Sequence, residues 1–270
     1  MKWNKCEIDY LKDNATSKTF GELVRDLDRS KGSINYKLVD LGLHSRDFVP
    51  VKDVNENFFD IWTEEMSYIL GYWFADGNIK NGNDNRYTFR IDSNDKSIID
   101  KIQTCMKSNH KIYHRKSTGG YCLGIGNKKI YNDIIKLGGL PKKSLINKFP
   151  YVPKEYVRHF IRGYFDGDGC ITHSGKKKNV PVIIFIGTKE FLNKLMEYTP
   201  YRVKKITQRT KNNTYEIRFR SEMAQSILEY MYDKSSIYLD RKYNLYKKCM
   251  KWERKSKPYP DYSKYIENEI

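Results

Sequence analysis

Two aspartates stand at matching places in two nearly repeated segments of the chain. One segment spans residues 69–77 and carries Asp76 before its last glycine, and the other spans 161–169 and carries Asp168 in the same place. Each segment is apolar and rich in small residues, which is typical of a packed helix that ends at a glycine. A single helix of this kind is usually only a packing element, but two of them predict a site with paired carboxylates.

The repeat continues beyond these two segments. The aspartates lie 92 residues apart, and the pattern of apolar residues predicts the same order of elements after each of them. The first copy has a strand over 86–92, a helix over 94–106, a hairpin with strands over 111–116 and 121–126, and a helix near 130–137 that carries Ile130, Ile134, Ile135 and Leu137. The second copy has a strand over 181–187, a helix over 189–198, strands over 202–209 and 214–220, and a helix over 222–232. We therefore expect an α+β fold with a pseudo-twofold pair of α-β-β-α-β-β-α halves.

Small residues mark one face of each repeated helix. Gly71 and Ala75 in the first helix, like Gly163 and Gly167 in the second, are four residues apart and share a side. Such a face lets two helix backbones approach closely, which brings the C-terminal ends and their aspartates together. Two carboxylates at the negative ends of two helix dipoles repel each other unless a cation compensates them. Oxygen ligands in a site completed by substrate phosphates favour Mg²⁺, with Mn²⁺ as a substitute.

These features resemble the paired motifs of the LAGLIDADG homing endonucleases, in the single-chain form that carries both motifs. The resemblance covers about residues 60–250, and residues 143–160, which lead into the second motif, resemble the family as well. It implies that Asp76 and Asp168 are the catalytic metal ligands, with Ala75 and Gly167 beside them at the metal site. The resemblance assigns no residue as the family's auxiliary lysine or glutamine.

The first motif departs from the family pattern at one position. Phe74 stands where an acidic residue is common, whereas the second motif has Asp166 there. Since that position is not the essential ligand, the resemblance still implies a nuclease that hydrolyses one phosphodiester in each strand of double-stranded DNA across the minor groove. The two halves differ in sequence, so we expect a monomer that acts on a long target without a palindrome.

The charge of the chain agrees with a nucleic-acid partner. There are 50 Lys and Arg residues against 33 Asp and Glu residues, which gives a net charge of +17 and an isoelectric point near 9.4. Basic residues alternate with apolar ones in the predicted strands, so they fall on the face away from the core and would form a basic, saddle-shaped surface of antiparallel sheets. The residues expected on this face are Arg86, Thr88, Arg90, Arg218 and Arg220.

The first 46 residues are predicted to form a separate all-α module. A short helix over 6–12, a second that opens with a capping box of Thr19 and Glu22, and a third from about residue 33 to Gly42 resemble a helix-turn-helix DNA-binding domain. The residues expected to contact DNA from the third helix are Lys31, Ser33, Asn35, Tyr36 and Lys37. A small packing subdomain without a DNA role is the alternative. The expected domains are 1–46 for the module, 47–57 for a linker, 58–140 and 141–250 for the two halves, and 251–270 for a C-terminal tail.

Several other classes of protein do not fit the sequence. No run approaches the roughly 18 apolar residues of a membrane span, and the N-terminus lacks the apolar region of a signal peptide. Five cysteines without C-x-x-C spacing indicate reduced thiols. His110 and His114 lie on one face of a strand, too far apart for an unaided zinc pair and without a third ligand nearby. We therefore expect an intracellular protein, in the cytoplasm, the nucleoid or an organelle, with no membrane partner.

Two other functions remain compatible with the sequence. The chain could be a non-cleaving DNA-binding regulator built on the same scaffold, although the presence of both aspartates favours the nuclease. It could also be an RNA-binding maturase that assists the splicing of its own intron. RNA co-precipitation with a splicing assay would separate the maturase from a nuclease encoded by a mobile element.

Overall fold

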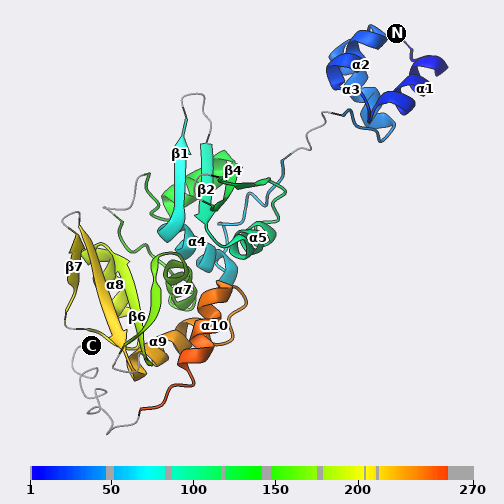
Figure 1. Ribbon diagram of the computed structural model, residues 1–270. Helices are drawn as coiled ribbons and strands as arrows, with labels where there is room; N and C mark the ends of the chain where they lie inside the picture. The colour runs from blue at the N-terminus through cyan, green and yellow to red at the C-terminus, as the bar shows by residue number, and fades with distance from the viewer. Residues whose placement is uncertain are drawn as a thin grey trace. The chain divides into compact units, whose positions relative to one another are not determined.

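The computed structural model describes most of the chain, in two compact units, Met1–Lys52 and Asp53–Ile270 (Figure 1). The described residues are 2–46, 52–82, 87–116, 119–141, 147–174, 179–203, 205–210 and 213–254. Several residues named above therefore lie outside the description: Arg86, the start of the lead-in at Lys143 and Ser144, part of the linker and most of the tail. The boundary between the units, after Lys52, falls inside the predicted linker 47–57.

The first unit contains the three helices that the sequence predicts. They are α1 (Lys5–Asn14), α2 (Phe20–Leu27) and α3 (Lys31–Asp40). The expected capping box opens α2, since the Thr19 side chain accepts a hydrogen bond from the backbone of Glu22 and the Glu22 side chain accepts one from the backbone of Thr19. Apolar side chains from all three helices pack into one small core, with Leu11, Leu23, Ile34 and Leu38 buried.

The second unit contains two sheets and seven helices among its described residues. The helices are α4 (Glu64–Asp76), α5 (Lys96–Cys105), α6 (Lys128–Lys136), α7 (Val157–Asp168), α8 (Lys189–Glu197), α9 (Glu222–Tyr232) and α10 (Asp240–Cys249). The first sheet has the order β1-β2-β4-β3 and the second β5-β6-β8-β7, with every described pair antiparallel. The strands are β1 (Gly77–Asn81), β2 (Tyr87–Ser93), β3 (Ile112–His114), β4 (Tyr121–Gly126), β5 (Cys170–Ser174), β6 (Val180–Gly187), β7 (Thr207–Thr210) and β8 (Thr214–Arg220). The predicted α+β fold with paired halves is confirmed.

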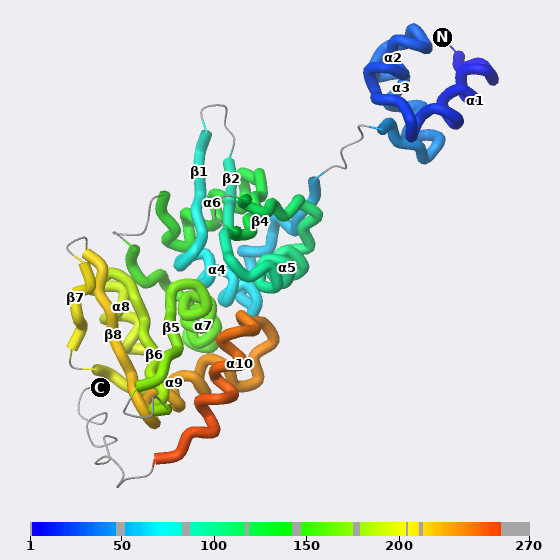
Figure 2. The backbone as a smooth tube through the Cα atoms, in the orientation of Figure 1, coloured from blue at the N-terminus to red at the C-terminus, as the bar shows by residue number. Residues whose placement is uncertain are grey.

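The two halves pack around one helix pair. Figure 2 shows α4 and α7 between the two sheets, and these helices make the most extensive contact between any two elements. Helices α5 and α6 pack on the first sheet, and α8 and α9 pack on the second. The alternation read from the sequence decides which strand residues face these helices, because Phe89 and Ile91 in β2 and Ile217 and Phe219 in β8 are buried.

Some details differ from the sequence-based expectations. Strands β1 and β5, which follow the two aspartates directly, are short and polar enough that no alternation identifies them. The predicted strand over 202–209 begins only at Thr207, and its neighbour β8 is paired through an irregular register. Ile135 is 39% exposed although its spacing predicts the apolar face of α6. None of the helices in the described part of the chain combines the length and apolarity that a membrane crossing needs.

Candidate active site

Glycines allow the backbones of α4 and α7 to touch. A Cβ atom placed on Gly71 would lie 2.0 Å from the carbonyl oxygen of Phe160, and one placed on Gly163 would lie 2.0 Å from the carbonyl oxygen of Tyr68. Because real Cβ atoms do not come so close to a carbonyl oxygen, any larger residue at either position would push the helices apart. The small-residue faces of the two motifs therefore meet each other at this crossing.

The C-terminal ends of the same two helices also lie together. A Cβ atom on Gly167 would lie 2.3 Å from the Cβ of Ala75 and 3.4 Å from Oδ2 of Asp76. Asp76 and Asp168 are the last residues of their helices, and both are exposed. Burial raises the pKa of Tyr164, and the charges of Asp168 and then Asp76 raise it further. The contact of Gly167 with Ala75 and Asp76 places the two aspartates at adjacent helix ends.

The donor set suits a hydrated, oxygen-liganded cation. In the described ranges, no group of three or more His, Cys, Asp or Glu side chains is placed to hold a metal ion. Two exposed carboxylates, with the backbone carbonyls of Ala75 and Gly167 nearby, leave most of a coordination shell to water and substrate oxygens. Mg²⁺ is commonly bound in this way, through one or two carboxylates and substrate phosphates. The residues present therefore fit Mg²⁺ or Mn²⁺ better than a closed zinc site.

A buried lysine donates hydrogen bonds to backbone carbonyls on both sides of Asp168 at the end of α7. Lys242 of α10 is 2% exposed, and its Nζ donates hydrogen bonds to the carbonyl oxygens of Phe165, of Asp166 at 3.0 Å and of Gly169 at 2.5 Å. The carbonyl oxygen of Phe165 also accepts the backbone N–H of Gly169 at 2.8 Å, so the lysine adds a second donor there, and its ammonium charge offsets the negative end of the helix dipole. Burial lowers the pKa of Lys242 to about 8, while the charge of Asp166 raises it.

The end of α4 has a different and uncharged partner. Asn147 donates a hydrogen bond from Nδ2 to the carbonyl oxygen of Phe74 at 3.2 Å, and Thr188 donates from its hydroxyl to the carbonyl oxygen of Asn147 at 2.7 Å. Phe74 takes the place in α4 that Asp166 takes in α7, two residues before the aspartate. The two carboxylates thus lie at helix ends of unequal charge. Neither Lys242 nor Asn147 belongs to a repeated motif, so no pattern in the sequence identifies them as site residues.

Asp166 lies inside the protein rather than in the exposed site. Its carboxylate accepts hydrogen bonds from the hydroxyl of Tyr68 at 2.7 Å, the hydroxyl of Tyr232 at 2.5 Å and the backbone N–H of Leu239 at 2.8 Å. Burial raises the pKa of this carboxyl group. This acidic residue of the second motif therefore joins α7 to α4, α9 and the start of α10.

The residues expected on the outer sheet faces alternate with buried ones as predicted. Thr88 and Arg90 flank buried Phe89, and Arg218 and Arg220 flank buried Phe219. Each of these arginines has a polar partner on the same sheet: Arg90 pairs with Asp92, Arg218 with Glu216, and Arg220 donates to the Ser174 hydroxyl at 2.7 Å. Arg86 lies in a gap of the described chain.

The first unit presents its third helix to solvent. Lys31, Asn35 and Tyr36 are exposed, whereas Ser33 and Lys37 are partly buried. The Lys37 ammonium is 2.7 Å from the Asp40 carboxylate, and the backbone N–H of Ser33 is bonded to the Ser30 side chain, which caps the helix.

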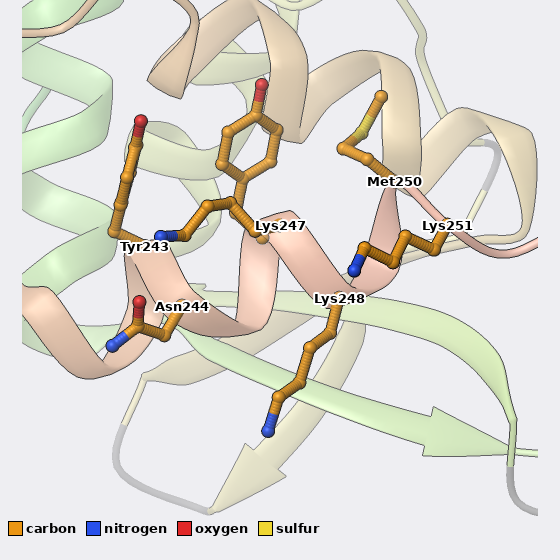
Figure 3. A pocket seen from close by; sticks show the side chains of 7 residues that line it. Tyr243, Asn244, Lys247, Lys248, Met250 and Lys251 are labelled. Carbon is orange, nitrogen blue, oxygen red and sulfur yellow. The ribbon is translucent and has the colours of Figure 1, made fainter.

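A pocket beside α10 is a separate feature of the surface. It has a volume of about 820 Å³ and is lined by Tyr243, Asn244, Tyr246, Lys247, Lys248, Met250 and Lys251 (Figure 3). Its lining contains lysines and tyrosines and no carboxylate, so it offers no hard anionic ligands. The arrangement that can hold a divalent cation is the pair of helix ends, not this pocket.

A family model and several known proteins match this chain. The chain matches the family model of the LAGLIDADG-like domain over residues 63–136 and 155–231. The first range contains α4 to α6, and the second contains α7, α8 and all but the last residue of α9. Among curated proteins, a probable translation initiation factor IF-2 of Methanocaldococcus jannaschii is 29% identical over 166 residues, which are 56% of this chain and 13% of that protein. An uncharacterized protein of the same organism is 26% identical over 152 residues, which are 52% of each chain. The chain thus spans only part of the length of both relatives.

Similar solved structures include two LAGLIDADG proteins in complex with DNA. The I-LtrWI LAGLIDADG homing endonuclease bound to target DNA is 14% identical, with a TM-score of 0.48, and the match covers 72% of this chain and 89% of that one. The LAGLIDADG meganuclease I-AabMI bound to uncleaved DNA is 12% identical, with a TM-score of 0.47, and the match covers 68% of this chain and 88% of that one.

Proposed function

Because the chain belongs to the LAGLIDADG-like domain family, we propose that it is a site-specific endonuclease for double-stranded DNA that uses Mg²⁺ or Mn²⁺. One observation carries this proposal: two motif helices in van der Waals contact bring Asp76 and Asp168 together at their exposed C-terminal ends. The outer sheet faces on either side of this pair carry arginines, which suits a phosphate backbone. A cation between the helix ends and DNA would complete its coordination with substrate oxygens.

The roles of the residues follow from their places. Asp76 and Asp168 would hold the metal, with the carbonyl oxygens of Ala75 and Gly167 at its edge. The bound metal would supply Lewis-acid chemistry, which activates water and neutralises charge on the leaving oxygen. The residues Thr88, Arg90, Arg218 and Arg220 would orient the duplex on the sheets, since phosphate contacts position DNA and base contacts give specificity.

Three finer statements belong to the same proposal. One chain carries both carboxylates, so the protein would work as a monomer. The two halves differ in their outer-face residues, so the target would be long and asymmetric. The first unit would add contacts as a helix-turn-helix-like module through Lys31, Ser33, Asn35, Tyr36 and Lys37, because the third helix exposes polar side chains next to its N-terminus.

Replacing each aspartate separately tests the proposal. Asp76→Asn and Asp168→Asn keep the shape of the side chain and remove one anionic ligand, so double-strand cleavage of a target selected from a DNA library with Mg²⁺ should nearly vanish. The loss should exceed the roughly 10- to 100-fold that removal of an outer-shell partner of a metal site costs. Binding measured by gel shift without metal should persist or tighten, because each carboxylate repels nearby phosphates.

A matched variant and the wild type complete this test. Asp100→Asn removes an exposed carboxylate that pairs with Lys96 on α5, away from the helix ends, and should cut at the wild-type rate. Cleavage at the wild-type rate by both Asp76→Asn and Asp168→Asn would contradict the paired-carboxylate mechanism. A wild type that binds its selected DNA but does not cut it with Mg²⁺ or Mn²⁺ would instead favour the regulator.

A further inference from the structure

The two sheets can be aligned row by row from their aspartates. Asn78 and Cys170 each lie two residues after their aspartate, in β1 and β5. Asn78 is opposite Arg90 in β2, and Cys170 is opposite Ile184 in β6. Arg90 and Ile184 therefore occupy the same place in the two halves, on the strand next to the one that leaves the active site.

The arginine at this row changes strand between the halves. In the first sheet Arg90 of β2 is opposite Gly124 of β4, and in the second sheet Ile184 of β6 is opposite Arg218 of β8. Each row therefore holds one arginine across the two central strands, but on β2 in one half and on β8 in the other.

An acidic residue moves together with the arginine. One step along the same face, Asp92 of β2 is opposite Cys122 of β4, and Ile186 of β6 is opposite Glu216 of β8. The arginine and the carboxylate thus remain two residues apart on one strand in both halves. The pair lies on β2 in the first half and on β8 in the second. The two halves therefore share its position on the sheet but not its position in the sequence repeat.

In the first half, Asp92 holds two arginines. Nε and Nη2 of Arg90 donate to the two carboxylate oxygens of Asp92, both at 2.9 Å, and Nη2 of Arg115 lies 3.4 Å from the same carboxylate. The hydrogen bonds that Arg90 donates to Asp92 raise the pKa of Arg90. The Asp92 side chain is 25% exposed, whereas those of Arg90 and Arg115 are 41% and 38% exposed.

In the second half, Glu216 of β8 also pairs with two arginines, one on β8 and one on β7. Nε of Arg218 lies 2.6 Å from one carboxylate oxygen of Glu216, and Nε of Arg209 in β7 lies 3.4 Å from the other. The Glu216 side chain is 8% exposed, and the two arginines are 58% and 48% exposed. Each cluster therefore has a carboxylate beneath two guanidinium groups that face solvent.

Stability is a weak reason for such clusters, since ion pairs of arginines that are about half exposed to solvent contribute little to it. A carboxylate also lowers the attraction of a DNA-facing surface for phosphates, because each cluster then carries a charge of about +1 in place of +2. Guanine, however, is neutral and presents two acceptors, O6 and N7, to one arginine, as the two oxygens of Asp92 do. The carboxylate therefore disfavours phosphate far more than it disfavours a guanine edge.

We propose that Asp92 and Glu216 are positioning residues for DNA specificity, an inference that rests on the proposed function. In the absence of DNA, each carboxylate orients its two arginines and opposes their binding to phosphate. On the target, an arginine leaves the carboxylate and binds the edge of a guanine instead. Selectivity then arises from weaker binding to wrong sequences as well as from contacts to the right one. The DNA half-site bound by the first sheet therefore contains a guanine opposite Arg90, and the half-site bound by the second sheet contains one opposite Arg218.

Binding to two duplexes tests this proposal without cleavage. Affinity is measured in EDTA for a target selected in vitro and for a scrambled duplex of the same length, with wild type, Asp92→Asn and Glu216→Gln. Each variant should bind the scrambled duplex more tightly and lower the ratio of target to scrambled affinity at least about tenfold. The plot of log affinity against log salt for the scrambled duplex should steepen by about 0.9 for each added phosphate contact.

Two control variants remove a carboxylate from an ion pair elsewhere in the same half. Asp100→Asn breaks a pair with Lys96 on α5, and Glu197→Gln breaks a pair with Lys194 on α8. Both make the same change in net charge and should leave the affinity ratio within about twofold of wild type. Thermal melting of all variants checks that each is folded, and the two clusters give independent results if one substitution prevents folding.

The outcomes separate this inference from the proposed function. An unchanged ratio in Asp92→Asn and Glu216→Gln, with a wild type that prefers its target, would overturn the inference and leave the nuclease intact. An equal gain in affinity for both duplexes would overturn it too, since charge alone would then explain the effect. A wild type that prefers no duplex would overturn both proposals.

Discussion

Helices α4 and α7 end in the same way but are supported by different chemistry. Both carry a glycine at the crossing and an exposed aspartate as the last residue. Two positions nevertheless differ in kind, because α4 has Leu70 and Phe74 where α7 has Arg162 and Asp166. All four of these side chains are buried.

The charged pair of α7 connects it to the C-terminal part of the second half. Arg162 donates hydrogen bonds to the carbonyl oxygens of Ile237 and Met231 at 2.9 and 2.8 Å, and to the Glu64 carboxylate at 2.8 Å. Asp166 binds the start of α10, and Lys242 of α10 binds the end of α7. The two helices therefore share the glycines and aspartates of the site, whereas the buried side chains beside them are charged in α7 and apolar in α4.

The largest effect is expected where the two helices are alike. Gly163→Leu and Gly71→Leu each insert a side chain where a backbone oxygen lies 2.0 Å from the new Cβ, so each should destabilise the protein by about 3 kcal/mol or more and abolish cleavage. Thermal denaturation followed by circular dichroism measures this. Gly124→Ala, which has open space around its Cβ, should melt like wild type. A wild-type melting temperature for Gly163→Leu would mean that these helices do not form the described crossing.

The next effect should distinguish the two halves. Lys242→Met leaves three carbonyl oxygens at the end of α7 without their cationic donor, which should cost about 3 kcal/mol in stability. Asn147→Ala removes one neutral hydrogen bond at the end of α4 and should cost about 1 kcal/mol.

For the proposed nuclease, the rates at which the two DNA strands are cut should also show the unequal support of the ends of α4 and α7. Lys242→Met should slow the cut of one strand about tenfold more than the other, because it disturbs the position of Asp168 and spares that of Asp76. Duplexes labelled on one strand at a time measure both rates. Lys242→Arg, which keeps the charge and the donors, should restore part of the bias, and equal slowing of both strands would contradict a one-sided effect.

Removal of the first unit tests its contribution to DNA binding. A chain without residues 1–46 should keep the folded helix pair and bind its target more weakly, with a shallower salt dependence if the module contacts phosphates. Footprinting of the shortened and the complete chain compares the length of protected DNA. An unchanged footprint would show that the module does not touch the target.

The last expected effect is a pH dependence of stability that arises from His159 in the second half. Burial, and then the charge of Arg162, lowers the pKa of His159 to about 4. The unfolded chain takes up this proton near its ordinary pKa of about 6.5, so stability falls as the pH decreases from about 6.5 to 4. His159→Gln should flatten this part of the stability curve, measured by urea denaturation at several pH values. An identical curve for the variant would show that His159 does not titrate in that window.

Short-range patterns in the sequence determined the central part of the fold. The four-residue spacing of small residues after Gly71 and after Gly163 identifies the helix faces that meet. The repeated Asp76 and Asp168 identify the helix ends that come together. The capping box at Thr19 and the alternation around Phe89 also predict structure, because helix and strand periods act over a few residues. The roles of the site residues stay predictions until the substitutions above are made.

Tertiary structure alone decided which side chains support this site. Lys242 lies 76 residues from Asp166, and Asn147 lies 73 residues from Phe74, so no local period connects either pair. The clusters around Asp92 and Glu216 depend on sheet register, which places an arginine on β2 in one half and on β8 in the other. The sequence repeat determines where the two carboxylates lie, whereas the charges and hydrogen bonds around them come from contacts between distant parts of the chain, which only the folded structure brings together.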